Sequence, residues 1–260
     1  ITHQPTGKKL SYGELTHKAA SIEIPESVKL KDPKKFRIIG TDLPRTDTPL
    51  KVNGTAVYAM DVDLPGMVYA FIERCPYFGG KIKAIDDRDA RNINGVLDIF
   101  EIETGIAVVG VSTWAAMQGR KKLKITWDKG SNKYPDSSSI YKLFEQRSKK
   151  RGSKGRSDGN VKRALKNADI VVDAVYEVPF QAHATMEPMN CVVDYRSDQC
   201  QVWVPTQSPR DAQKRVSEMT GIPIDRVIIN VTFLGGGFGR RAFNDFVEEG
   251  LEVSMHMKKP

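Results

Sequence analysis

The stretch Val231-Thr-Phe-Leu-Gly-Gly-Gly-Phe-Gly-Arg-Arg241 decides how the second half of the chain is interpreted. The run that leads into it, residues 226–234, is rich in β-branched and aromatic side chains and predicts a buried strand. The run after it has apolar residues at helical spacing between Phe243 and Leu251 and predicts an amphipathic helix. Glycines between a strand and a helix allow a ligand to approach the backbone closely, so the loop is a candidate anion-binding or oxo-binding site. A tight turn without a ligand is the alternative.

The positive charge of the chain is local. The 260 residues include 40 Lys and Arg against 32 Asp and Glu, for a formal net charge of +8. Ten basic and two acidic residues lie between Lys142 and Lys166, and they account for the whole excess. Within this segment, residues 151–159 predict a solvated, mobile connector. No aromatic residue lies between Phe144 and Tyr176 to stack on bases, so nucleic-acid binding is not expected.

Composition places the chain among globular proteins. It is 40% hydrophobic and 28% charged and has no long uncharged apolar run, so no membrane span is expected. Cys75, Cys191 and Cys200 lack the spacing of a zinc or haem site; buried free thiols are expected, with a Cys191–Cys200 contact across a hairpin as the alternative. The chain starts at Ile1 without a leader and ends at Pro260 just after a predicted helix, which suggests a fragment of a longer protein.

The pattern changes three times along the chain and predicts an α+β protein of four regions. Residues 1–45 form an N-terminal helix, which begins at Tyr12 after a capping box, and a connector. Residues 46–128 form a small α+β domain, residues 129–164 a basic helix and mobile connector, and residues 165–260 the start of a second α+β domain.

The first α+β domain is expected to begin with a hairpin of two strands, over residues 55–62 and 67–73. Further strands are predicted over residues 81–85, 96–102, 106–109 and 123–127, with helices over residues 86–92 and 112–120. The predicted core consists of Val57, Met67, Tyr69, Phe71, Val96, Ile99, Val108, Trp114 and Ile125.

The second half predicts a long strand over residues 170–178 and then an antiparallel pair over residues 192–195 and 200–204. A helix from Pro209 to Thr220 has proline at its start and Gly221 just past its end. The predicted strand, glycine loop and final helix follow.

Three stretches converge if these strands share a sheet: residues 181–190, residues 203–209 and the glycine loop. His183 and Glu187 could form an acid/base pair, or they could hold the backbone through polar contacts. Gln207 could hydrogen-bond a cofactor oxygen, or it could cap the helix that follows.

A dinucleotide-binding oxidoreductase of the Rossmann type is one alternative, because Gly237-Phe-Gly-Arg-Arg-Ala242 fits G-x-G-x-x-A between a strand and a helix. That fingerprint needs an acidic residue about 20 positions later, where this chain has Lys258 and Lys259. A basic interaction module that binds nucleic acid or an anionic surface is a second alternative.

Several motifs occur together in the order found in the molybdenum hydroxylases, the xanthine dehydrogenase and aldehyde oxidase family. The sequence resembles this family over nearly its whole length, and within it the large subunits of isoquinoline 1-oxidoreductase-like enzymes. The motifs that carry the resemblance are Pro44–Asp47, Lys51–Gly54, Leu64–Gly66, Ser112–Arg120, His183–Asn190, Pro205–Gln207 and Gly235–Arg241.

The resemblance implies that residues 46–128 are an α/β hammerhead domain and that a molybdenum-binding domain begins near residue 165. It implies a molybdenum–pterin cofactor, in its cytosine dinucleotide form. The residues implied to bind the cofactor are Gln207, Gly236, Gly237, Phe238, Gly239 and Arg240, and those implied to line the substrate pocket are Met186 and Glu187.

The resemblance also implies an aldehyde or N-heteroaromatic substrate, a two-iron two-sulfur small subunit, a cytochrome c electron acceptor and a periplasmic location, with the cytoplasm as the alternative. This sequence departs from the family's pattern at two places, and each departure limits what the resemblance implies. Purine-oxidising relatives have a glutamate where this chain has Ala242, so purine oxidation is not expected. The Gly-x-Gly-Glu segment that carries the family's general base does not occur in this chain, so we expect no catalytic residue, no direct metal ligand and no activity in this segment alone.

Overall fold

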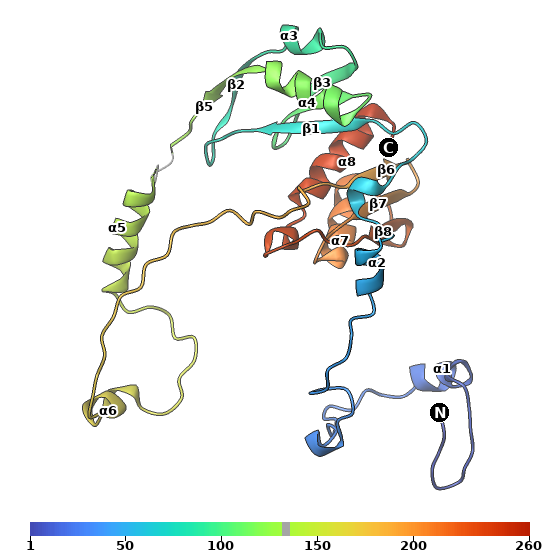
Figure 1. Cartoon of the computed structure of the whole chain (residues 1–260), viewed down its shortest axis with the longest axis vertical. Helices are drawn as coiled ribbons and strands as arrows, with labels where there is room; N and C mark the ends of the chain where they lie inside the picture. Colours follow the sequence, from blue (N-terminus) through green and yellow to red (C-terminus); the bar gives the residue numbers. More distant parts are fainter. Residues whose placement is uncertain (132–135) are drawn as a thin grey trace. The chain divides into compact units, whose positions relative to one another are not determined.

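The computed structural model describes residues 1–131 and 136–260 (Figure 1). The chain forms two compact units, residues 1–55 and residues 56–260. Residues 132–135, which fall within the predicted region 129–164, lie outside the described residues. In the part of the chain that is described, no helix has the length and apolar character needed to cross a membrane.

The first unit contains helices α1 (Tyr12–Ala20) and α2 (Thr48–Val52) and the 3-10 turn η1 (Pro33–Lys35). The predicted capping box forms at α1: the Ser11 amide donates to Glu14 Oε2 at 2.7 Å, and the Glu14 amide donates to Ser11 Oγ at 3.3 Å. No residue of α1 is buried, so local capping carries more weight here than packing.

The second unit begins with a three-stranded antiparallel sheet in the order β1-β4-β3, formed by Tyr69–Arg74, Gly105–Gly110 and Val96–Ile102. The central strand β4 is buried along its whole length because sheet neighbours flank it and helix α4 (Thr113–Lys122) packs on it. The predicted cap is present, since the Ala115 amide donates to Ser112 Oγ. Short helix α3 (Arg88–Arg91) packs against α4.

A two-stranded antiparallel sheet pairs β2 (Lys81–Asp86) with β5 (Lys124–Asp128). Its Ile125 side chain is partly buried against the cluster of Ala90, Ile99, Ile106 and Val108. This cluster is the apolar core beneath α3 and α4.

The third sheet, in the order β6-β7-β8, supports the glycine loop. Strands β6 (Val192–Tyr195) and β7 (Cys200–Val204) are the predicted antiparallel pair, and β8 (Val227–Val231) lies parallel to β7. Helix α7 (Pro209–Thr220) and 3-10 turn η3 (Ile224–Arg226) connect β7 to β8, and α7 ends at Gly221 with a φ of 74°. Helix α8 (Asp245–Met257) packs on β6, and its fully buried Leu251 joins the core with Val202 and Val204.

Two predicted strands are wrong. Residues 55–62 form no hairpin strand; they contain the 3-10 turn η2 (Ala59–Asp61), where the Asp61 carboxylate accepts the Tyr58 amide at 2.8 Å, and only Tyr58 makes an isolated bridge, to Phe233. Two residues predicted to lie in the core are exposed instead. Val57, in this segment, is 54% exposed, and Trp114, in α4, is 67% exposed. The Asp61 side-chain oxygen competes with a neighbouring strand for the Tyr58 backbone N–H. A composition rich in β-forming residues does not reveal this competition.

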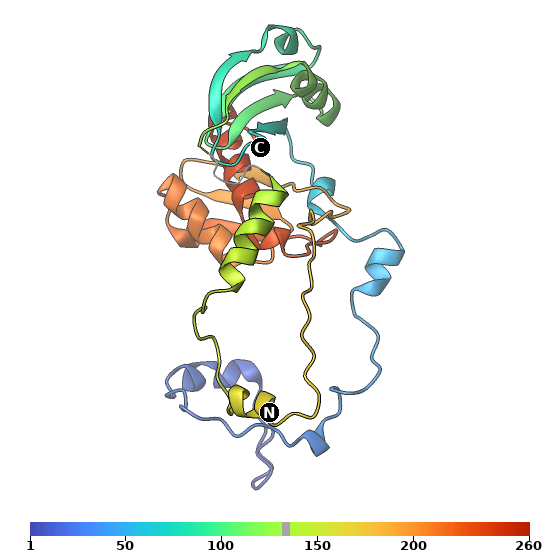
Figure 2. The same cartoon turned by 90° about the vertical axis from the view of Figure 1, so that its left-hand side faces the viewer.

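Residues 170–178 are extended but pair with no strand in the described chain (Figure 2). Their apolar side chains are exposed, Val172 by 83% and Tyr176 by 90%. Strand propensity reflects packing against neighbours, so it produces no strand where no sheet edge is present. Before this segment lie helix α5 (Ser137–Ser148), which is the predicted basic helix, and the short helix α6 (Val161–Lys166).

The cysteines are free thiols, and two of them lie in the third-sheet core. Burial raises the pKa of Cys191 and of Cys200 to about 12. We therefore expect iodoacetamide at pH 8 to alkylate Cys75 first and to reach Cys191 and Cys200 only on unfolding, because the thiolate is the reactive form. Peptide mass spectrometry over a urea series measures this order. Labelling of Cys200 as fast as Cys75 in the folded protein would contradict it.

Candidate functional site

Arg241 connects the three stretches that the sequence predicts to converge. Its side chain is fully buried. The guanidinium donates from Nε to the Gly236 carbonyl at 2.7 Å and from Nη2 to the Glu187 carbonyl at 2.7 Å. The backbone carbonyl of Arg241 accepts the backbone N–H of Gln207 at 3.0 Å and the Thr206 hydroxyl at 3.2 Å. One residue thus binds the glycine loop, residues 181–190 and residues 203–209 together.

Glu187 is the acidic partner of Arg241. It is 9% exposed, and its Oε2 lies 3.0 Å from Arg241 Nη2. Burial lowers the pKa of Arg241, and the Glu187 carboxylate opposes this effect. Arginine nevertheless stays protonated near neutral pH, so the two form a buried ion pair.

Glu187 also holds the start of the glycine loop. The Gly235 amide donates to Glu187 Oε2 at 2.9 Å, and the Glu187 amide donates to the Gly235 carbonyl at 3.0 Å. The backbones are so close that a Cβ added at Gly235 would lie 2.3 Å from Glu187 Cβ. Residue 235 must therefore be glycine, because a side chain there would clash with Glu187.

His183 fixes the tip of the loop. Its Nδ1 lies 2.7 Å from the Phe238 carbonyl oxygen, and because a carbonyl only accepts, Nδ1 is the protonated nitrogen. Phe238 has a φ of 48°, in the left-handed region that costs a non-glycine residue on the order of 1–3 kcal/mol. The loop glycines on either side, Gly236 and Gly239, also have positive φ.

Replacement of His183 by alanine is expected to release Phe238 from this conformation while leaving the fold intact, because His183 is exposed. The Arg240 amide, which donates to the Gly237 carbonyl at 2.9 Å, should then exchange with deuterium several-fold faster. Hydrogen-exchange mass spectrometry of the loop peptide measures this, with His17→Ala, at an exposed site in α1, as the control. Unchanged exchange in the loop would show that His183 does not hold it.

Gln207 presents its side chain beside the loop. A Cβ added at Gly237 would lie 3.0 Å from Gln207 Oε1, so the amide rests against this glycine. Gln207 is exposed, and within the described chain its side-chain amide has no hydrogen-bond partner. The amide is therefore free to bind a ligand.

The other predicted site residues divide into two groups. Met186 and Phe238 have exposed side chains, by 93% and 73%, and could contact a bound molecule. Arg240 instead forms a two-point ion pair with Asp245 at 2.7 and 2.8 Å, and Glu187 is occupied by Arg241 and Gly235. Of the two alternatives for His183 and Glu187, the structure has polar contacts to the backbone, at Phe238 and Gly235, and no acid/base pair.

The residues fit a cofactor that brings its own ligands to a metal. Among residues 1–131 and 136–260, no group of three or more His, Cys, Asp or Glu side chains could hold a metal ion. The site offers instead a neutral, unpaired amide and a glycine backbone free of side chains, which suit the oxygen atoms of an organic metal-carrying group.

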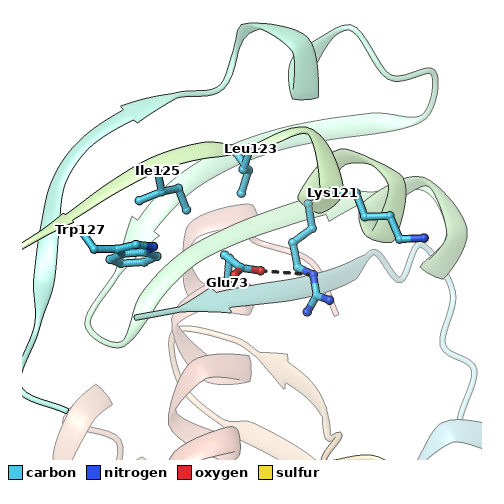
Figure 3. Close-up of a pocket in the computed structure, with 6 residues that line it drawn as sticks. Glu73, Lys121, Leu123, Ile125 and Trp127 are labelled. Atoms are coloured by element: carbon cyan, nitrogen blue, oxygen red, sulfur yellow. Dashed lines mark ion pairs between the residues drawn. The ribbon is translucent and has the colours of Figure 1, made fainter. Parts of the chain in front are cut away.

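A separate cavity of about 350 Å³ lies in the region of β1, α4 and β5 (Figure 3). Its lining includes the Glu73–Arg120 ion pair, 3.5 Å between Oε2 and Nε, and the side chains of Leu123, Ile125 and Trp127. None of the predicted site residues lines it.

The class of protein follows from a comparison of sequences. The profile of the molybdopterin cofactor-binding domain matches residues 144–257, which include His183, Gln207 and the glycine loop. The chain is related to the molybdenum hydroxylases, and the resemblance expected from its motifs is confirmed. The Rossmann alternative also lacks geometric support, because 3-10 turn η4 (Arg240–Ala242) separates the glycines from the start of α8.

Individual relatives agree with this class. The chain is 29% identical to the beta subunit of isoquinoline 1-oxidoreductase from Brevundimonas diminuta, over 93% of this chain and 36% of the relative. It is 25% identical to a nicotinate dehydrogenase subunit from Pseudomonas putida, over 98% of this chain and 22% of the relative. The chain thus spans about a third or less of the length of these relatives.

Solved structures show the fold. Quinoline 2-oxidoreductase from Pseudomonas putida 86 matches 85% of this chain and 34% of its own chain with a TM-score of 0.63 at 18% identity. Aldehyde oxidoreductase from Desulfovibrio gigas matches 88% of this chain and 30% of its own with a TM-score of 0.62 at 15% identity. The predicted mixing of α and β structure is confirmed by this likeness.

Sequence reasoning missed Arg241 as the residue that joins the site. It stands beside Arg240, and nothing in the local pattern distinguishes the buried arginine from the one bound to Asp245. The signal that could have found a buried arginine is the single acid of the motif 183–190, Glu187, which needs a basic partner when it is buried.

Proposed function

We propose that this chain supplies one wall of the cofactor site in the large subunit of a molybdenum-dependent hydroxylase. The observation that carries the proposal is the unpaired Gln207 amide beside Gly237, in a loop fixed by a buried ion pair. The relatives' names support the reaction class, since they include oxidoreductases of isoquinoline and of aldehydes.

When bound, the molybdenum–pterin cofactor supplies a two-electron oxidation in which oxygen from water is transferred to an aldehyde or N-heteroaromatic carbon. The residues of this chain would bind the cofactor and orient it. Gln207 would donate a neutral hydrogen bond to the cofactor, and the backbone of Gly237, Phe238 and Gly239 would hold it. Met186 and Phe238, both exposed, would be available to contact the substrate.

Finer features belong to the same proposal. The cofactor takes the cytosine dinucleotide form, residues 46–128 act as a hammerhead domain, and the enzyme works in the periplasm. Electrons leave through a two-iron two-sulfur small subunit to an acceptor such as cytochrome c. Two relatives that are themselves named as subunits support an assembly of several chains.

The test is Gln207→Ala in the assembled enzyme. The loss of one preorganised donor to a cofactor oxygen is expected to lower kcat by about 10²–10³-fold. The assay follows ¹⁸O from labelled water into the oxidised N-heterocycle or aldehyde, and Gln146→Ala, at an exposed glutamine of α5 outside the three site stretches, is the control. Wild-type rates in the Gln207 variant, or product oxygen that comes from O₂, would refute the proposal.

The chain by itself is proposed to hold no molybdenum and to be inactive, because a single wall binds a large cofactor weakly. Metal analysis of the purified 260-residue chain checks this. Stoichiometric molybdenum in that sample would show that the residues described here are sufficient for cofactor binding.

A further inference from the structure

We propose that Arg241 and Glu187 are positioning residues: their ion pair sets where the Gln207 amide and the Phe238–Gly239 backbone stand relative to the cofactor. Neither residue touches the cofactor in this proposal, which rests on the proposed function. Glu187 is thereby reassigned from the substrate pocket, where the resemblance places it, to the support behind the loop.

The guanidinium shape is essential to this role. Arg241 uses Nε for the Gly236 carbonyl and Nη2 for Glu187, so two fixed directions join two different segments. A lysine ammonium at this depth carries the same charge but lacks the fork that reaches both acceptors at once. Arginine is required here for geometry more than for charge.

The backbone of Arg241 transmits the same constraint to Gln207. Its carbonyl accepts the backbone N–H of Gln207, and the buried Thr206 hydroxyl lies within hydrogen-bond distance of that carbonyl, at 3.2 Å, and of Asn244 Oδ1, at 3.0 Å. These contacts tie residues 206–207 to residue 241. A shift of the Arg241 backbone therefore displaces the Gln207 backbone.

Glu187 completes the link from the other side. Its Oε2 accepts both the Gly235 amide and Arg241 Nη2, while Oε1 accepts Asn190 Nδ2 at 3.0 Å. A single carboxylate thus orients the first residue of the loop and the arginine that ends it. The loop between Gly235 and Arg241 is clamped at both ends by one buried pair.

A second ion pair in the same unit provides a matched control. Arg74 on β1 donates from Nε to Glu249 on α8 at 2.6 Å, and Glu249 is 3% exposed. This pair joins a sheet to a helix, and none of its hydrogen bonds in the described chain reaches residues 181–190, 203–209 or 235–241. Arg74→Lys therefore perturbs a comparably buried carboxylate without touching the site.

The first experiment is hydrogen exchange of the 260-residue chain, comparing Arg241→Lys and the milder Glu187→Gln with Arg74→Lys. In both site variants the amides of Gly235 and Gln207 should exchange at least tenfold faster, together, than in the wild type. In Arg74→Lys these two amides should change no more than the β6–β7 amides do. Equal effects of Arg241→Lys and Arg74→Lys at Gly235 and Gln207 would overturn the proposal.

The second experiment measures molybdenum per polypeptide and KM against kcat in the assembled enzyme. Arg241→Lys should lower molybdenum content several-fold, and the molecules that retain it should show a reduced kcat with little change in KM. Wild-type molybdenum content and kcat in Arg241→Lys would overturn the positioning role but not the proposed function. Absence of molybdenum from the wild-type enzyme would instead refute the proposed function.

Discussion

Replacement of Glu187 by alanine is expected to lower the free energy of unfolding by about 3–5 kcal/mol, because it leaves the Arg241 charge buried without its partner. Arg241 is fully buried and already has one nitrogen, Nη1, without a hydrogen-bond partner in the described chain. The change also removes the acceptor of the Gly235 amide. Both losses occur at the same buried site. Water cannot replace the lost hydrogen bonds there unless the loop opens.

Urea unfolding followed by circular dichroism measures this change. The control is Glu248→Ala, which breaks the Arg215–Glu248 pair between α7 and α8, where both side chains are partly exposed; a loss of only about 0–1 kcal/mol is expected there. The double variant Glu187→Ala/Arg241→Met should recover part of the stability, since it removes both charges. Similar losses in Glu187→Ala and Glu248→Ala would show that the Arg241 charge is not buried as described.

The second large effect is expected at Gly235. Alanine at this position places a Cβ 2.3 Å from Glu187 Cβ and 3.3 Å from Glu187 Cα, so the two backbones must move apart. Overpacking of this kind costs typically about 1–3 kcal/mol and sometimes more. The movement also breaks the paired hydrogen bonds between Gly235 and Glu187, so we expect loss of both stability and the shape of the loop.

Thermal unfolding and hydrogen exchange of the loop together measure this effect. The control is Gly152→Ala, in the connector, where an added Cβ meets nothing within 4 Å and φ is not positive. That variant should unfold as the wild type does. A Gly235→Ala protein with wild-type stability and exchange would mean that residues 187 and 235 are further apart than described.

Local signals predicted much of the fold. The capping box of α1, the Ser112 cap of α4, and the proline and glycine that bound α7 each act within a few residues, and each is present. The antiparallel pair β6–β7 was predictable because its turn is short. The two wrong strands fail for different reasons: at residues 55–62 the Asp61 carboxylate accepts the Tyr58 backbone N–H, whereas residues 170–178 have no partner edge in the described chain.

The candidate site was predictable in its outline. Gln207 and the glycine loop follow the neighbouring strands β7 and β8, whereas His183 lies in the unpaired segment before β6 and reaches the loop through Phe238. Their exact support was not predictable, since only the folded chain shows that Arg241 points inward to Glu187 while Arg240 turns to Asp245. The roles of the site residues in binding the cofactor stay predictions.

The unpaired segment before β6 has a consequence for how the chain behaves in solution. From Ile170 to Phe180, every second side chain is apolar, and within the described residues the segment's backbone N–H and C=O groups have no strand partners. Such an edge is a template for aggregation. We expect Asp173 and Glu177, on the alternate positions, and the charge of +8 in residues 142–166 to oppose such aggregation by repulsion between copies of the chain. Because salt screens that repulsion, the solubility of this chain should fall as ionic strength rises.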